Sequence, residues 1–107
     1  MIIHTVAFKL KHPVGSAAEQ LFLAKGSRLA EIDGVENFRC LRQISLKNPY
    51  DFNFSMQFVD QAAYDHYNQH PDHQNFVQNV WLQEVVEFLE ADFVEMESGS
   101  PSSTREN

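Results

Sequence analysis

Basic residues are missing from most of the second half of this 107-residue sequence. Of its eight lysine and arginine residues only Arg105 lies beyond Lys47, and the formal net charge is −7. Proteins bind nucleic acids and anionic membranes mainly through clustered lysine and arginine side chains. We therefore expect neither a nucleic acid nor a membrane surface among its partners.

Cysteine and long apolar segments are also scarce. The single cysteine, Cys40, excludes an internal disulfide and a zinc site built from several cysteines. No apolar run approaches the roughly 20 residues of a membrane-spanning helix. Residues 1–4 show neither the basic start nor the apolar stretch of a secretory signal. Together these absences predict a cytoplasmic protein.

Phenylalanine, in contrast, is abundant, with nine residues in one small chain. We expect a single domain over residues 1–97, followed by a disordered tail over residues 98–107, which is polar and rich in serine. A domain of this size has room for one modest core. So many bulky rings favour an additional apolar surface, either a ligand pocket or a contact with a partner.

Alternation of apolar and other residues predicts four strands, at residues 2–10, 35–46, 51–59 and 86–96. The clearest pattern lies in 51–59, where every second residue is apolar and the residues between are polar: Phe52, Phe54, Met56 and Phe58 against Asn53, Ser55 and Gln57. This alternation predicts a strand with one wholly buried face.

Capping signals predict the helices between these strands. Ser16 and Glu19 have the spacing of a capping box at the start of a first helix, which ends near Gly34. Asp60 is expected to cap a second helix that stops before Pro71. Asp72 is expected to cap a further helical stretch that extends past residue 81.

The resulting order, βαββαβ, predicts an α+β domain with a ferredoxin-like fold, in which helices cover one face of a four-stranded antiparallel sheet. Such a sheet leaves its second face bare, yet several strands carry apolar residues on both faces. Since the chain has no further segment to cover that face, a second copy is the economical solution. We therefore predict a homodimer.

Three histidines near the second helix first suggest a metal site. His66, His70 and His73 follow one another at intervals of four and three, which would align them on an unbroken helix. Pro71 interrupts the helix between the second and third, and no further ligand is obvious. We expect no metal, and for His66 a solvent-exposed position.

Two other side chains are open to a structural or a functional interpretation. His4 alternates with apolar residues on the first strand, so it is either a hydrogen-bonded core residue or an acid–base group in a desolvated place. Tyr67 is either a core aromatic residue or a phenol that hydrogen-bonds a ligand oxygen.

Two segments together resemble a known family. The strand His4-Thr5-Val6-Ala7-Phe8-Lys9 and the segment from Tyr64 to the turn His70-Pro71-Asp72-His73 are similar to the stress-responsive dimeric α/β barrel family, over roughly residues 2–97. The resemblance implies a ferredoxin-like domain whose sheet packs against that of a second copy. Many members have no assigned physiological role, and we expect the same here, with a small apolar ligand pocket.

A plant member of this family implies an alternative, because it is a polyketide cyclase that closes a poly-β-keto chain without a cofactor. The residues implicated there match His73, Tyr67 and His4 in this sequence. The resemblance then implies a base at His73, a hydrogen-bond donor at Tyr67, no cofactor, and a small apolar, aromatic or polyketide-like ligand. An isomerase-like enzyme would use the same groups.

We also expect Phe22, Phe76 and Trp81 to form the pocket wall. A further alternative is a cofactor-independent monooxygenase of the neighbouring dimeric α/β barrel group.

Overall fold

A computed structural model describes residues 1–97, so the predicted tail lies outside the described residues. Its strands are β1 (Ile2–Leu10), β2 (Glu36–Arg42), β3 (Phe52–Phe58) and β4 (Val85–Val94). Its helical segments are α1 (Ala17–Ser27), η1 (Arg28–Glu31), α2 (Gln61–Gln69), α3 (Pro71–Phe76), η2 (Val77–Trp81) and α4 (Leu82–Glu84).

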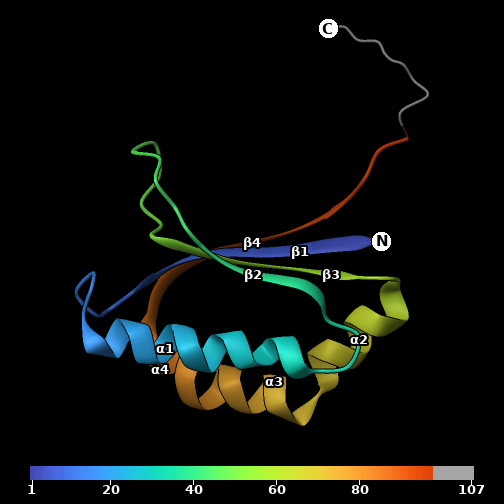
Figure 1. Cartoon of the computed structure of the whole chain (residues 1–107), viewed down its shortest axis with the longest axis horizontal. Coiled ribbons are helices and arrows are strands. Elements are labelled where there is room, and N and C mark those ends of the chain that lie inside the picture. The colour runs from blue at the N-terminus through green and yellow to red at the C-terminus, as the bar shows by residue number, and fades with distance from the viewer. Residues whose placement is uncertain (98–107) are drawn as a thin grey trace, which may run out of the picture.

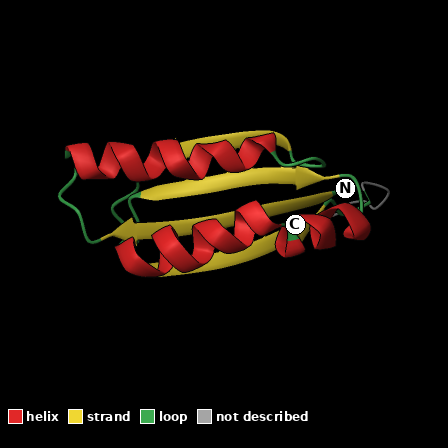
Figure 2. Cartoon of the chain, turned by 90° about the horizontal axis from the view of Figure 1, so that it is seen from below, coloured by secondary structure: helices red, strands yellow, loops and turns green. Residues whose placement is uncertain are grey.

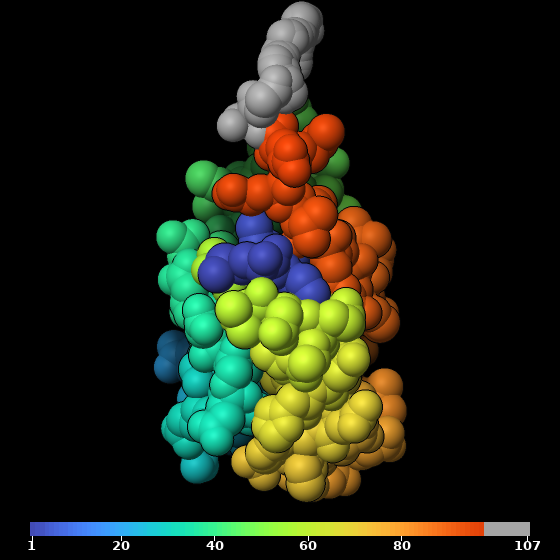
Figure 3. Space-filling view, turned by 90° about the vertical axis from the view of Figure 1, so that its right-hand side faces the viewer, coloured from blue at the N-terminus to red at the C-terminus, as the bar shows by residue number. Residues whose placement is uncertain are grey.

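The four strands form one antiparallel sheet in the order β2-β3-β1-β4. The helices lie together on one face of this sheet, and no helix of residues 1–97 covers the other face (Figures 1 and 2). In the space-filling view the N-terminus lies beside the orange-red end of β4 (Figure 3), in agreement with the pairing of Ile2 with Val94. The predicted ferredoxin-like fold is confirmed.

The core lies between the sheet and the helices and is built mainly from aromatic rings. The apolar side chains of β3 are all buried, at 3% exposure or less, whereas the polar residues between them are only half-buried. The Phe8 ring, on the central strand β1, packs against Phe22, Phe54 and Trp81 at centroid separations of 4.8 to 5.6 Å. Most of the phenylalanines are therefore used in the core.

Local capping explains where the helices begin. The Ser16 hydroxyl accepts a hydrogen bond from the Glu19 amide, and Asp60 accepts one from the Ala63 amide, as the spacing predicts. The third cap differs from the prediction, because the His70 ring, and not Asp72, accepts the hydrogen bond at the start of α3. Pro71 fits directly after this cap, at the first helical position, where a backbone N–H would have no partner.

The helix that follows His70 widens into the π-helical turn η2 before it reaches β4. Such turns admit an extra residue and occur frequently at functional sites. No helix within residues 1–97 is long and apolar enough to cross a membrane.

Candidate functional site

A cavity of about 230 Å³ lies between the sheet and the helical segments α3 and η2. Its sheet side consists of His4 and Val6 from β1 and Phe54 and Met56 from β3. Its helical side carries Tyr67, His73 and the apolar residues Phe76, Val77 and Trp81, while Leu82, Phe88 and Glu90 reach it from α4 and β4. The cavity is therefore apolar with a few polar groups, the usual composition of a small-molecule pocket.

His4 is buried at 5% exposure and is held by a hydrogen-bond network. Its Nδ1 lies 2.5 Å from Asp92 Oδ1 and 3.0 Å from the Tyr64 hydroxyl, which itself donates to Asp92 Oδ2 at 2.7 Å. Because a carboxylate accepts hydrogen bonds, His4 donates through Nδ1–H, and Nε2 is the nitrogen that remains. Glu90 Oε2 lies 3.6 Å from that Nε2.

The same network acts on the Tyr64 phenol. Burial raises the pKa of Tyr64 above its usual value, and the hydrogen bond to Asp92 and the charges of Asp92 and Glu90 raise it further. Tyr64 therefore stays protonated and acts as a donor that holds the Asp92 carboxylate in place beside His4.

His73 follows Pro71 on α3, where its ring packs on the Tyr67 ring with the centroids 4.3 Å apart. Its Nδ1 lies 3.3 Å from the Asn68 carbonyl oxygen and donates to it, so that Nε2 keeps the lone pair in the neutral ring. Burial lowers the pKa of His73 below 6.5, and the nearby His4 and His70 act in the same direction, whereas the Asn68 hydrogen bond and Glu90 oppose it. His73 is thus a neutral imidazole at neutral pH.

Tyr67 is 2% exposed, and its hydroxyl has no hydrogen-bond partner among residues 1–97. Burial and the charge of Glu90 raise the pKa of this phenol, so it remains an O–H donor. A buried hydroxyl without a partner costs about 1–3 kcal/mol. The group that would satisfy it has to enter the cavity.

The chain matches one protein family over most of its length. The stress responsive A/B barrel domain matches residues 2–95. The chain belongs to this family. No curated protein matches its sequence.

Solved structures show how this A/B barrel domain relates to others. A Dabb family protein with a ferredoxin-like fold from Mesorhizobium loti is 52% identical, covers 90% of this chain and 97% of its own, and has a TM-score of 0.88. A dimeric ferredoxin-like protein of unknown function from Thermobifida fusca is 20% identical, covers 88% and 90% of the two chains, and has a TM-score of 0.73.

A hydroxynitrile lyase from Passiflora edulis is 11% identical, covers 91% of the A/B barrel chain and 94% of its own, and has a TM-score of 0.78. At these identities the Thermobifida and Passiflora proteins show the fold alone.

The structure of the A/B barrel domain brings most of the sequence-predicted residues together. His4, Tyr67 and His73 line one cavity, and Phe76 and Trp81 are part of its wall. Phe22 does not line it, because its ring lies in the core against Phe8, Phe54, Phe76 and Trp81.

Sequence reasoning missed Asp92, Tyr64 and Glu90 as members of the site. Asp92 and Glu90 lie opposite His4 and Val6 in the pairing of β1 with β4, and therefore on the helix-covered face of the sheet. A signal was present, since Phe88, Glu90 and Asp92 alternate along the predicted last strand. It could be used only once the neighbour of that strand was known.

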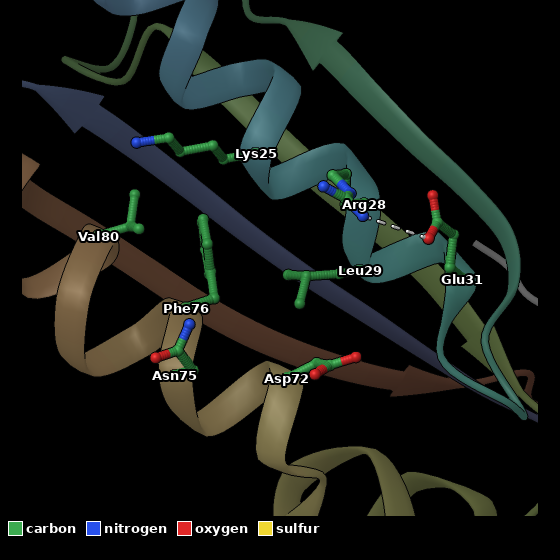
Figure 4. Close-up of a pocket in the computed structure, with 8 residues that line it drawn as sticks. All are labelled: Lys25, Arg28, Leu29, Glu31, Asp72, Asn75, Phe76 and Val80. Atoms are coloured by element: carbon green, nitrogen blue, oxygen red, sulfur yellow. Dashed lines mark ion pairs between the residues drawn. The ribbon is translucent and has the colours of Figure 1, made fainter.

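A larger hollow, of about 440 Å³, opens between α1–η1 and α3–η2. Figure 4 shows Lys25, Arg28, Leu29 and Glu31 on one side and Asp72, Asn75, Phe76 and Val80 on the other. Its charged side chains are exposed to solvent, and Arg28 pairs with Glu31 at 4.0 Å. It shares Leu29 and Phe76 with the smaller cavity but contains none of the histidines or tyrosines. We therefore place the candidate site of the A/B barrel domain in the smaller cavity.

The three closely spaced histidines have separate surroundings. The His66 and His70 rings lie 5.6 Å apart, His70 caps α3, and His73 faces Tyr67. Across residues 1–97 no group of three or more histidine, cysteine or acidic side chains is arranged to hold a metal ion.

Proposed function

We propose that this A/B barrel domain is a homodimeric protein that binds a small, largely apolar carbonyl compound in the cavity lined by His4, Tyr67 and His73. The observation that carries the proposal is the Tyr67 hydroxyl, which has no hydrogen-bond partner within residues 1–97, is buried at 2% exposure and borders the cavity. A carbonyl oxygen is the simplest acceptor for a phenol that stays protonated.

The dimensions and lining of the cavity support this choice of ligand. A volume of about 230 Å³ lies below the roughly 300–1,000 Å³ of pockets for drug-sized molecules, so the ligand is small. The wall formed by Phe54, Phe76 and Trp81 suits a ring or a short alkyl chain. Buried polar groups that a ligand must satisfy also give selectivity, because an analogue without the oxygen leaves Tyr67 unpartnered.

The homodimer rests on the sheet face without helices. Leu89 and Phe93 project from β4 on that face, opposite Ala7 and Ile3 of β1, and are 59% and 54% exposed. The loop between β2 and β3 stands out on the same side (Figure 1) and carries Ile44, which is exposed as well. Apolar surface of this kind is a usual interaction site, and the Thermobifida neighbour is described as dimeric.

Binding of a matched pair of probes tests the ligand proposal. Phenylacetone offers a carbonyl oxygen to Tyr67, whereas propylbenzene has a similar shape without it. A hydrogen bond contributes about 0.5–1.5 kcal/mol, so we expect Tyr67→Phe to weaken phenylacetone binding roughly twofold to tenfold and to leave propylbenzene unchanged. Ligand-observed NMR titration measures both affinities. Equal losses for the two probes, or no binding of either, would count against the proposal.

The second candidate function is cofactor-free acid–base catalysis on the bound carbonyl compound. It is favoured by the hydrogen bond from His73 Nδ1 to Asn68, because this bond leaves the lone pair of a neutral imidazole on Nε2. Nε2 could take a proton from the carbon beside the carbonyl group while Tyr67 donates to the developing enolate oxygen. His4, fixed by Asp92, is the second imidazole at the cavity.

Such a step is common to several reactions. Both a cyclase and an isomerase begin with removal of an α-proton from the carbonyl compound. A monooxygenase stays a weaker alternative. A stress-linked role, a cytoplasmic location and the division into a domain and a disordered tail also stay predictions from the sequence.

A further inference from the structure

We propose that Glu90 makes the cavity selective for uncharged ligands and excludes carboxylates and other anions. This inference rests on the proposed ligand-binding function and deepens it, because it names the charge of the compound that the cavity accepts.

The ionisable side chains that line the cavity are His4, Tyr67, His73 and Glu90. Burial raises the pKa of Tyr67 and lowers the pKa of His73, so both side chains are uncharged at neutral pH. His4 donates to the Asp92 carboxylate, with its Nδ1 2.5 Å from Asp92 Oδ1. Among the described residues Glu90 is thus the one acidic side chain in the cavity lining, since Asp92, the partner of His4, is not part of it.

The cavity offers an entering anion no basic side chain other than its two histidines. The lining contains no lysine or arginine, and between Lys47 and the end of the described residues the chain has neither. An anion would therefore lose hydration without gaining a counter-charge, which is unfavourable. A neutral ketone, aldehyde, nitrile or phenol does not incur this cost.

Glu90 lies where the cavity opens to solvent. Its side chain is 55% exposed, so it stands at the boundary between the cavity and solvent, beside the exposed apolar residues Leu82 and Phe88. Its carboxylate nevertheless reaches within 3.6 Å of His4 Nε2 inside the cavity. A ligand that enters past Leu82 and Phe88 meets an apolar rim and one negative charge.

Two probes with the same ring and a side chain of similar size, but different charge, test whether Glu90 selects ligands by their charge. Phenylacetone is neutral, phenylacetate is an anion, and both have a similar size. We expect the wild-type protein to bind phenylacetone more tightly than phenylacetate. Because Glu90 is partly exposed and its field is screened, we expect Glu90→Gln to strengthen phenylacetate binding by about fivefold relative to phenylacetone binding. The gain should shrink in 0.5 M NaCl, where the Debye length falls to roughly 4 Å.

Glu87→Gln is the matched control. Glu87 lies on the same strand and is exposed in the single chain, but it lies opposite Lys9 in the sheet register, on the face without helices and away from the cavity. This variant makes the same change in net charge and should leave the preference between the two probes unchanged.

The outcomes separate this inference from the proposed function. If phenylacetone binds but Glu90→Gln leaves the preference unchanged, or Glu87→Gln alters it equally, charge selection by Glu90 is wrong while ligand binding stands. If wild type binds phenylacetate as tightly as phenylacetone, charge selection is likewise wrong. If neither probe binds to any variant, both proposals fail.

Discussion

At the scale of single residues, the cavity places two imidazoles in opposite surroundings. His4 has a carboxylate near each ring nitrogen, Asp92 at 2.5 Å and Glu90 at 3.6 Å. His73 has a backbone carbonyl at one nitrogen and packs on the Tyr67 ring, and its pKa is lowered mainly by burial. Pairs of titratable groups with contrasting environments are typical of acid–base sites. In this pair His73 is the proposed base, and His4 is an imidazole held in place by Asp92.

This assignment predicts how proton exchange depends on pH. In D2O the protein should exchange the α-hydrogens of bound phenylacetone, because Nε2 of His73 takes up a proton, exchanges it with the solvent for a deuteron, and returns the deuteron to the carbon. The lowered pKa keeps the imidazole neutral below the usual value of 6.5, so the rate should be constant above pH 6.5 and fall only as the pH drops through the lower pKa of the folded protein. Proton NMR of the probe measures the rate after subtraction of solvent-catalysed exchange.

Replacement of His73 tests whether it is the base, and replacement of His66 is the control. His73→Gln should reduce exchange about 10²- to 10⁴-fold, the usual contribution of a general base. His66→Gln removes an exposed histidine on the neighbouring helix and should have no effect. Exchange that is equally fast in His73→Gln would assign the chemistry to another group.

The residues that sequence reasoning found and missed differ in the range of their contacts. His73 and Tyr67 are six positions apart on consecutive helices, so a local motif was enough to connect them. Asp92 is 88 positions from His4, and their contact depends on the pairing of β1 with β4. The alternation of residues in β4 gives its two faces but does not identify its neighbour. The contacts of His4 with Asp92 and Glu90 therefore could not be predicted until the sheet order was known.

At the scale of elements, the sequence predicted those features that depend on a few adjacent residues. The caps at Ser16 and Asp60 involve side chains within three positions of the amides they bind. The cap at His70 was missed because Asp72 is a more usual capping residue, and the choice between them is made by the position of Pro71 at the start of α3. The π-helical turn η2 has no simple sequence signal, yet it carries Val77 and Trp81 into the cavity wall.

The packing of α1 on β3 predicts a stability effect at Gly26. This glycine lies within α1, and a Cβ atom there would overlap the ring of Phe54, which is itself 1% exposed. Alanine would gain about 1 kcal/mol in helix propensity, but overpacking of a rigid core costs about 1–3 kcal/mol, and overlap with a buried ring is at the upper end of that range. We expect Gly26→Ala to lower the free energy of unfolding by about 1–2 kcal/mol in urea denaturation.

A double-mutant cycle shows whether the Phe54 ring is the cause. In a Phe54→Leu background the side chain at position 54 is smaller, so the cost of Gly26→Ala should fall or change sign. Because Phe54 lines the cavity, Gly26→Ala should also weaken phenylacetone binding in proportion to any displacement of the ring. A variant more stable than wild type would show that α1 can move away from the sheet.

At the scale of the whole molecule, the two faces of the sheet have separate roles. The helix-covered face holds the aromatic core and the candidate site, whereas the other face carries apolar side chains without cover among the described residues. The bare face was predicted from the sequence, because the number of elements is too small to cover two faces. What the sequence could not supply is which apolar side chains lie there, since that depends on the register of β1 with β4.

The prediction at this scale concerns Leu89, which is 59% exposed on that face. Because its side chain contacts little within the single chain, Leu89→Asp should leave the fold intact but introduce an unpaired charge between two packed sheets. Native mass spectrometry should show wild type at twice the chain mass of 12.3 kDa and Leu89→Asp at the single mass, with unchanged far-UV circular dichroism. Leu21→Asp, at a site 57% exposed on α1 in the helical layer, should remain dimeric. A wild-type protein that stays monomeric at high micromolar concentration, or a Leu21→Asp variant that dissociates as readily as Leu89→Asp, would contradict an interface on this face of the sheet.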